Sequence, residues 1–146
     1  MTFLPASLRL LVPLGLLALV AGCRQSSSTA PSGASAPAGA AADRGAALYA
    51  QNCVPCHHEN GEGLPKVFPS LSGSAAVVGD PVELAQWILS QKRPASIPAG
   101  RYPTQMLLFG WMSDPDAAAL LTYIRSHFGN SAPPVDAAMI AKSREK

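Results

Sequence analysis

Cys53-Val54-Pro55-Cys56-His57 is the stretch from which the fold of this chain can be predicted. Two cysteines separated by two residues, with a histidine directly after the second, form the C-x-x-C-H pattern of covalent c-type haem attachment. The spacing has a chemical reason. Each thiol can add across one haem vinyl group, and the histidine is then held against the ring, where an imidazole nitrogen can bind iron. The motif predicts one covalent haem c, with Cys53 and Cys56 as thioether residues and His57 as an iron ligand.

A C-x-x-C pair can also form a redox-active dithiol or half of a zinc site. A redox dithiol is expected beside a thioredoxin-like βαβ pattern, which this sequence lacks. A zinc site needs a fourth ligand. His58 follows His57 too closely to serve easily, and no cysteine follows Cys56. Haem attachment is therefore favoured over both alternatives.

The first 22 residues have the features of an export signal. One positive charge precedes an apolar run over residues 10–21, which is interrupted by Pro13. This run is too short for a membrane-spanning helix of about 20 apolar residues, but it fits the apolar core of a signal peptide. Val20-Ala21-Gly22-Cys23 follows, and it resembles the lipobox of bacterial lipoproteins. We expect a lipoprotein signal peptide over 1–22, removed so that Cys23 becomes the lipidated first residue of the mature chain.

Lipidation at Cys23 would anchor the protein to a membrane of the bacterial cell envelope, facing the periplasm. The inner and outer membranes both remain open. This location agrees with haem attachment at a C-x-x-C-H motif, which takes place outside the cytoplasm. Ordinary signal cleavage, with Cys23 left as a free thiol, is the alternative.

Residues 24–42 consist mainly of Ser, Thr, Ala, Pro and Gly. A segment with so few apolar anchors cannot bury enough surface to fold, so we expect a flexible linker over 23–42 behind the lipid anchor. The folded domain is expected over 43–130. Residues 131–146 are expected to form a C-terminal tail.

The composition limits the classes of function. The chain of 146 residues is 6% aromatic, which is low for a domain that must build its core from side chains alone. A covalent haem would supply much of the missing apolar mass. The formal charge is +2 and there is no basic stripe, so we expect no nucleic-acid partner.

Three segments of the domain have helical patterns. Residues 44–52 follow the potential N-cap Asp43 and end at the haem motif. A second helix is expected after Asp80, with a proline at its first position. Ser113-Asp114-Pro115-Asp116 predicts the start of a third helix, which Gly129 closes. Since no segment alternates like a strand, the sequence predicts an all-α domain with long loops around a cofactor.

With these helices placed, residues 43–130 resemble the class I c-type cytochromes. Gly45 and Tyr49 match the first helix of that family, and Leu120 and Tyr123 match its last helix. The resemblance implies the small all-α cytochrome c fold, with three or more helices. It also implies that the first and last helices cross at Gly45, where a glycine lets the two backbones approach closely.

A closer resemblance is to the small cytochrome domains of membrane-bound alcohol and aldehyde dehydrogenases and their oxidase-side relatives. It is carried by Phe68-Pro69-Ser70-Leu71, by residues 106–111, and by residues 120–125 followed by Phe128-Gly129-Asn130. Those relatives usually have proline directly after the methionine that binds iron. This chain has Leu107 at that place, and the loop is therefore expected to be less stiff.

The resemblance also implies the groups around the iron. Pro69 lies where class I cytochromes have a proline whose carbonyl accepts a hydrogen bond from the haem-binding histidine, here His57. Such a bond orients the ring and raises its basicity. Met106 and Met112 both precede the last helix, and the motif alignment favours Met106 as the ligand opposite His57. Met112 is the runner-up, because a side chain next to the helix cap more often packs under the helix.

Two further histidines are weaker candidates for the sixth ligand. His58 directly follows the first ligand and cannot easily reach the other face of the haem, so we expect it on the surface. His127 lies near a helix C-terminus, where a cationic side chain is favoured in any case.

This ligand set predicts the function. Iron bound by His and Met has no open position for a substrate, and thioether ligation raises the reduction potential. We expect a non-enzymatic electron carrier that takes single electrons from a dehydrogenase or a quinol-oxidising bc-type complex and passes them to a terminal oxidase or another acceptor. The alternative is a catalytic or gas-sensing haem with a labile sixth ligand. A third possibility is a subunit fixed in one dehydrogenase or oxidase complex.

Overall fold

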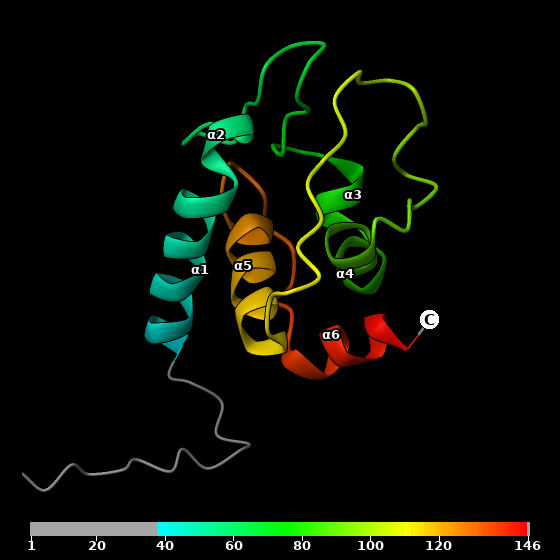
Figure 1. Ribbon diagram of the computed structural model, residues 1–146. Helices are drawn as coiled ribbons and strands as arrows, with labels where there is room; N and C mark the ends of the chain where they lie inside the picture. Colours follow the sequence, from blue (N-terminus) through cyan, green and yellow to red (C-terminus); the bar gives the residue numbers. More distant parts are fainter. Residues whose placement is uncertain (1–37, 146) are drawn as a thin grey trace, which may run out of the picture. The chain divides into compact units, whose positions relative to one another are not determined.

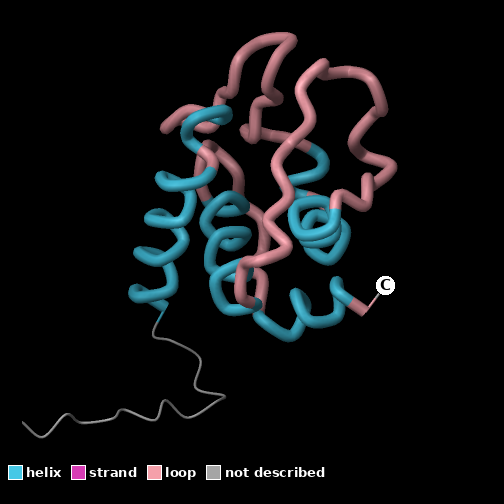
Figure 2. The backbone as a smooth tube through the Cα atoms, in the orientation of Figure 1, coloured by secondary structure: helices cyan, strands magenta, loops and turns pink. Residues whose placement is uncertain are grey.

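The computed structural model describes residues 38–145. The expected signal peptide over 1–22, the lipidation site Cys23 and the linker up to residue 37 lie outside this part of the chain. Within it, the secondary structure consists of helices and loops without a strand, as the all-α prediction requires (Figures 1 and 2). The helices are α1 (Ala38–Asn52), α2 (Val54–His57), α3 (Ala75–Val78), α4 (Pro81–Ser90), α5 (Asp114–Ser126) and α6 (Ala137–Arg144). None of these helices is long and apolar enough to cross a membrane.

Helices α1 and α5, which are far apart in the sequence, lie side by side (Figure 1). A Cβ atom at Gly45 would lie 2.4 Å from the carbonyl oxygen of Ala119 and 2.8 Å from the Cβ of Tyr123. The two backbones are thus in contact at Gly45, and any side chain there would push them apart. Tyr49 lies one turn further along α1. The centre of its ring is 5.5 Å from the ring centre of Tyr123 and 4.9 Å from that of Phe128.

The start of α1 differs from the expectation. The helix already includes Ala38, the first residue that the structure describes, so residues 38–42 belong to a helix and not to the expected linker. These residues read Ala-Gly-Ala-Ala-Ala, and alanine has the highest intrinsic helix propensity. Composition alone suggested a linker, but the same small residues extend a helix that α5 already holds in place.

The predicted starts of α4 and α5 are confirmed by their caps. The Asp80 carboxylate accepts hydrogen bonds from the backbone N–H groups of Val82 and Glu83. The Ser113 hydroxyl accepts one from the N–H of Asp116. These bonds satisfy N–H groups that have no partner inside the helix. The short helix α3 lies between α2 and α4 in the sequence, and no sequence pattern predicted it.

The segment expected to be a C-terminal tail instead folds onto the domain. Asp136 caps α6 by accepting a hydrogen bond from the N–H of Met139, and α6 packs against α4 and α5. Ile140 is fully buried, at 0% exposure. The domain therefore extends beyond residue 130, because α6 covers apolar surface that α4 and α5 would otherwise leave open.

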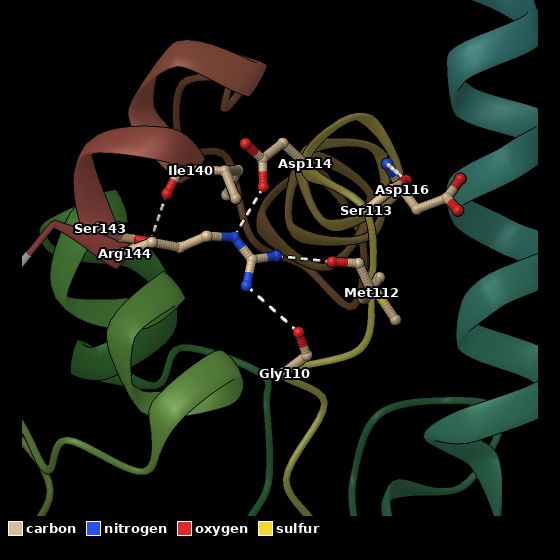
Figure 3. A network of polar contacts seen from close by, with 8 residues as sticks. All are labelled: Gly110, Met112, Ser113, Asp114, Asp116, Ile140, Ser143 and Arg144. Carbon is tan, nitrogen blue, oxygen red and sulfur yellow. Dashed lines mark hydrogen bonds and ion pairs between the residues drawn. The ribbon is translucent and has the colours of Figure 1, made fainter.

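Arg144, at the end of α6, ties this helix to the chain just before α5. Its guanidinium donates to the Asp114 carboxylate at 2.7 Å and to the carbonyl oxygens of Met112 at 2.6 Å and Gly110 at 3.2 Å (Figure 3). One side chain thus donates hydrogen bonds to two backbone carbonyls and forms an ion pair with one carboxylate. It fixes the last part of the loop that leads into α5.

Candidate functional site

The C-x-x-C-H motif forms a tight helical turn at the end of α1. The carbonyl oxygen of Cys53 accepts hydrogen bonds from the N–H groups of Cys56, at 3.1 Å, and His57, at 2.8 Å. The side chains of Cys53 and His57 are buried and that of Cys56 is half-buried. All three line one cavity, so the two thiols and the imidazole meet in the same space.

His57 is held by the loop that follows it. Its Nδ1 atom lies 3.0 Å from the carbonyl oxygen of Pro69. Because a carbonyl can only accept, Nδ1 carries the proton and Nε2 keeps a lone pair for a metal ion. Burial lowers the pKa of His57, and the hydrogen bond to Pro69 opposes this shift. The neutral imidazole that binds iron is therefore the favoured form.

At Gly63 the backbone of this loop passes close to the backbone of Phe68 and Pro69. Gly63 has φ +65°, and a Cβ atom there would lie 2.5 Å from the Pro69 carbonyl oxygen. The N–H of Gly63 donates to the carbonyl of His57 at 3.0 Å. A glycine is thus needed for the backbone to turn and bring Pro69 beside His57.

The cavity has the size and character of a cofactor site. Its volume is about 810 Å³, within the range of about 300–1,000 Å³ typical of small-molecule and cofactor pockets. It lies between the haem motif, the 68–71 segment, α3, one face of α4, the 93–107 loop and α5. Its apolar walls include Phe68, Leu71, Val77, Leu84, Trp87, Ile88, Phe109, Leu120 and Ile124. Paired thiols, a lone imidazole nitrogen and an apolar wall suit a covalently attached haem.

The two candidate methionines lie in different places. Met106 is half-buried and lines the same cavity as His57. Met112 is 2% exposed and packs in the hydrophobic core, outside the lining of the cavity. His58 and His127 are exposed and do not line the cavity. Met106 is thus the candidate sixth ligand that the structure brings together with the attachment motif.

The environment of Cys53 bears on the redox-dithiol alternative. Burial, with a smaller contribution from Cys56, raises the pKa of the Cys53 thiol to about 12. Reactive redox cysteines have lowered pKa values, because the thiolate is the attacking species. This buried thiol therefore lacks the character of a redox nucleophile. Within residues 38–145, no three side chains of His, Cys, Asp or Glu are grouped as a metal site.

Several residues of the site were not predicted from the sequence. Arg93 and Arg101 line the cavity, and the Arg93 guanidinium lies 4.7 Å from the ring centre of Trp87. Gln91 donates a hydrogen bond from its side-chain amide to the carbonyl oxygen of Met106. These residues come from irregular segments without periodicity. The local sequence around an arginine or a glutamine in a loop does not indicate which residues its side chain will contact.

Comparison with known proteins adds independent evidence. Residues 42–128 match the family model described as Cytochrome c. The chain is 32% identical over 103 residues to an alcohol dehydrogenase (quinone) cytochrome c subunit from Gluconobacter oxydans (strain 621H), a match covering 66% of this chain and 21% of the relative. The corresponding subunit from Komagataeibacter europaeus is 31% identical over the same shares. Cytochrome c-552 from Thermus thermophilus is 29% identical over 89 residues, which is 58% of this chain and 67% of the relative.

This chain spans about a fifth of the length of the dehydrogenase subunits that it matches. The match to the family model covers more than half of the chain, and it includes both the attachment motif and the crossing of α1 with α5. This chain therefore belongs to the cytochrome c family, and its cofactor is covalently bound haem c.

Proposed function

We propose that this protein carries single electrons on the periplasmic side of a bacterial membrane, through a haem attached at Cys53 and Cys56 and bound by His57 and Met106. Electron transfer by haem follows from the family, and the ligand pair, the partners and the location are the proposal. The observation that carries it is that Met106 shares a cavity with His57 and both thiols, whereas Met112 is buried elsewhere.

The ligand pair favours electron transfer over catalysis. Bound haem supplies an iron that cycles between the ferrous and ferric states. If His57 and Met106 both bind the iron, no coordination position is left for a substrate. A thioether stabilises the ferrous state and raises the potential. His57 is held by the Pro69 carbonyl and the Met106 backbone by the Gln91 amide, so little movement is needed when an electron arrives or leaves.

The surface beside Met106 suits brief contact with other proteins. Leu107 and Trp111 are 69% and 67% exposed, and Leu108 is exposed as well. Exposed apolar side chains grouped in one loop are typical of interaction sites. The relatives that are subunits of quinone alcohol dehydrogenases make a dehydrogenase a reasonable donor. A bc-type complex is the other donor we consider, and a terminal oxidase is a reasonable acceptor.

The location rests on the sequence upstream of the described residues. The lipobox-like segment ending at Cys23 supports a lipid anchor, and the Ser, Ala and Pro-rich stretch behind it supports a tether. A tethered domain can meet a donor and an acceptor in turn. A subunit fixed in one complex is the other arrangement, which co-purification of a stable complex from detergent-solubilised membranes would indicate.

The test compares two methionine variants. We expect Met106→Ala to abolish the weak near-infrared band of ferric Met ligation, lower the potential and let the ferrous protein bind carbon monoxide. Met112→Ala should keep all three properties near wild type, while it lowers the free energy of unfolding by about 2–5 kcal/mol because it leaves a cavity in the core. The opposite pattern would move the ligand to Met112. Ready binding of carbon monoxide by the folded wild type would favour a catalytic or gas-sensing haem.

A further inference from the structure

The loop that carries Met106 has few anchors of its own. Leu107 and Leu108, which directly follow it, are 69% and 52% exposed, so they add little packing. The next buried residue is Phe109. Within residues 38–145, the hydrogen bonds made by residues 98–108 are two, and both involve Gln91. The Met106 side chain packs against the hydrophobic core, but the hydrogen bond to its backbone comes from one side chain of another element.

The Gln91 amide makes both of these bonds. Its Nε2 atom donates to the carbonyl oxygen of Met106 at 2.8 Å, and its Oε1 atom accepts from Nε2 of Gln105 at 2.9 Å. The orientation of the amide is fixed because the Met106 carbonyl can only accept. One glutamine thus holds two neighbouring residues of the loop.

Gln91 is itself held at the C-terminal end of α4. It adopts the left-handed conformation, with φ 56° and ψ 23°, and its N–H donates to the carbonyl of Trp87 at 3.0 Å. The same helix end also holds the loop beyond Met106, because the carbonyl of Ile88 accepts from the N–H of Phe109 at 3.1 Å. Trp87 and Ile88 both line the haem cavity. The last turn of α4 therefore connects the wall of the haem cavity to the loop that carries Met106.

We infer that Gln91 is a positioning residue for the iron ligand: its side-chain amide holds the Met106 backbone so that the thioether stays on the iron. This inference rests on the proposed ligation by Met106. Leu107 and Leu108 are exposed and restrain the loop little. The hydrogen bond from Gln91, at the end of α4, supplies a restraint that these neighbours lack.

The conformation of Gln91 allows a test in which stability and ligation change in opposite directions. Glycine adopts the left-handed region without steric cost, so Gln91→Gly should leave the urea midpoint unchanged or raise it. The same variant loses the bond to Met106. We expect the ferrous protein to take up carbon monoxide about three- to tenfold faster, which is the factor that corresponds to the loss of one hydrogen bond. The near-infrared ferric band should weaken as well.

Two further variants make the test specific. Gln91→Glu keeps the size of the side chain but cannot donate to the Met106 carbonyl when ionised, so it should also speed carbon monoxide uptake. Lys66 has φ 66° and is exposed in the loop between His57 and Pro69. Lys66→Gly therefore relieves a similar backbone conformation without touching Met106, and its carbon monoxide uptake should equal that of wild type.

Each outcome separates the inference from the proposal on which it rests. If Met106→Ala shows that Met106 is the ligand but both Gln91 variants match wild type, the inference is wrong and the proposed function stands. If the gain in carbon monoxide uptake comes with an equal loss of global stability, the effect belongs to the fold and the inference is overturned. If the wild type lacks the band of Met ligation, both fail.

Discussion

The two sides of the haem cavity are built in different ways. On the attachment side, most hydrogen bonds join residues within 53–71: His57 bonds to Cys53 and to Pro69, and the N–H of Leu71 donates to Gly61 at 2.7 Å. On the methionine side, Met106 is held by Gln91, and the end of its loop is held by Arg144. The attachment side is stabilised mainly by bonds within its own segment, to which Asn130 adds a bond to the Leu71 carbonyl at 3.1 Å, and the methionine side is stabilised by side chains from outside its loop.

This difference separates a constant part of the site from an adjustable one. The buried His57 and the two thiols are fixed by a motif that allows little variation. The methionine loop depends on a few side-chain contacts with α4 and α6, and each can change without altering the attachment chemistry. We therefore expect variation in potential and ligand lability to arise on the methionine side, and loss of the cofactor to arise on the attachment side.

The largest effect should follow from breaking the attachment side. In the double variant Cys53→Ala with Cys56→Ala, no thioether can form, so haem should leave the polypeptide in acidified acetone. Wild type should keep its haem on a denaturing gel stained for haem. Cys23→Ser is the matched control, since it removes the remaining cysteine. It should keep the haem fully and be released from membranes if Cys23 is the lipid anchor. A double variant that still retains haem after extraction would contradict this attachment.

A smaller effect is expected at the helix crossing that supports the attachment side. Gly45→Ala puts a Cβ atom 2.4 Å from the Ala119 carbonyl oxygen, and neither backbone can move away freely. We expect the free energy of unfolding in urea to fall by about 1–3 kcal/mol. Gly39 is the control in the same helix, because a Cβ atom there meets nothing within 4 Å. Gly39→Ala should be neutral or stabilising by up to about 1 kcal/mol. Equal effects at both glycines would refute the close crossing.

The methionine side can be tested at Arg144, with Arg44 of α1 as the control. Each of these arginines pairs with an aspartate of α5. Arg144→Ala removes the pair with Asp114 and the bonds to two carbonyls, and we expect a loss of about 1–3 kcal/mol in urea unfolding. Arg44 pairs with Asp116 on the exposed surface at 2.8 Å, and Arg44→Ala should cost less. Arg144→Ala should also speed hydrogen exchange in the residues before α5. Equal losses for the two variants would show that the carbonyl bonds of Arg144 add nothing.

The smallest effect concerns acid. The hydrogen bond from Arg44 lowers the pKa of Asp116 below its usual value of 3.8. A carboxyl group with a lowered folded pKa stabilises the fold above the unfolded pKa, and this contribution is lost as the pH falls through the folded pKa. Wild type should therefore be slightly more stable than Asp116→Asn at pH 7, and the difference should vanish once the pH has fallen below the lowered pKa of Asp116 in the folded state. Urea midpoints of both proteins at several pH values measure it. A difference that persists in strong acid would show that ionisation of Asp116 is not its source.

The local sequence was enough to predict what depends on neighbouring residues. The C-x-x-C-H motif identified the cofactor, and the capping residues Asp80 and Ser113 marked the starts of α4 and α5. The resemblance to class I cytochromes added the Gly45 crossing and the contact between His57 and Pro69. The motif and the caps each have their physical cause in a few neighbouring residues, such as a cap that bonds the N–H groups beside it, whereas the crossing at Gly45 joins distant segments and could be expected only from the resemblance.

Tertiary structure decided the rest. It extended α1 back to Ala38, folded the expected tail into α6, and placed Arg144 on the carbonyls before α5. It also buried Met112 while leaving Met106 in the cavity, and set Gln91 against the Met106 backbone. The physical reason is that burial and long-range hydrogen bonds depend on which surfaces meet after the chain has folded. A methionine or glutamine in an irregular segment has the same local sequence preferences whether it faces a cofactor, a core or water.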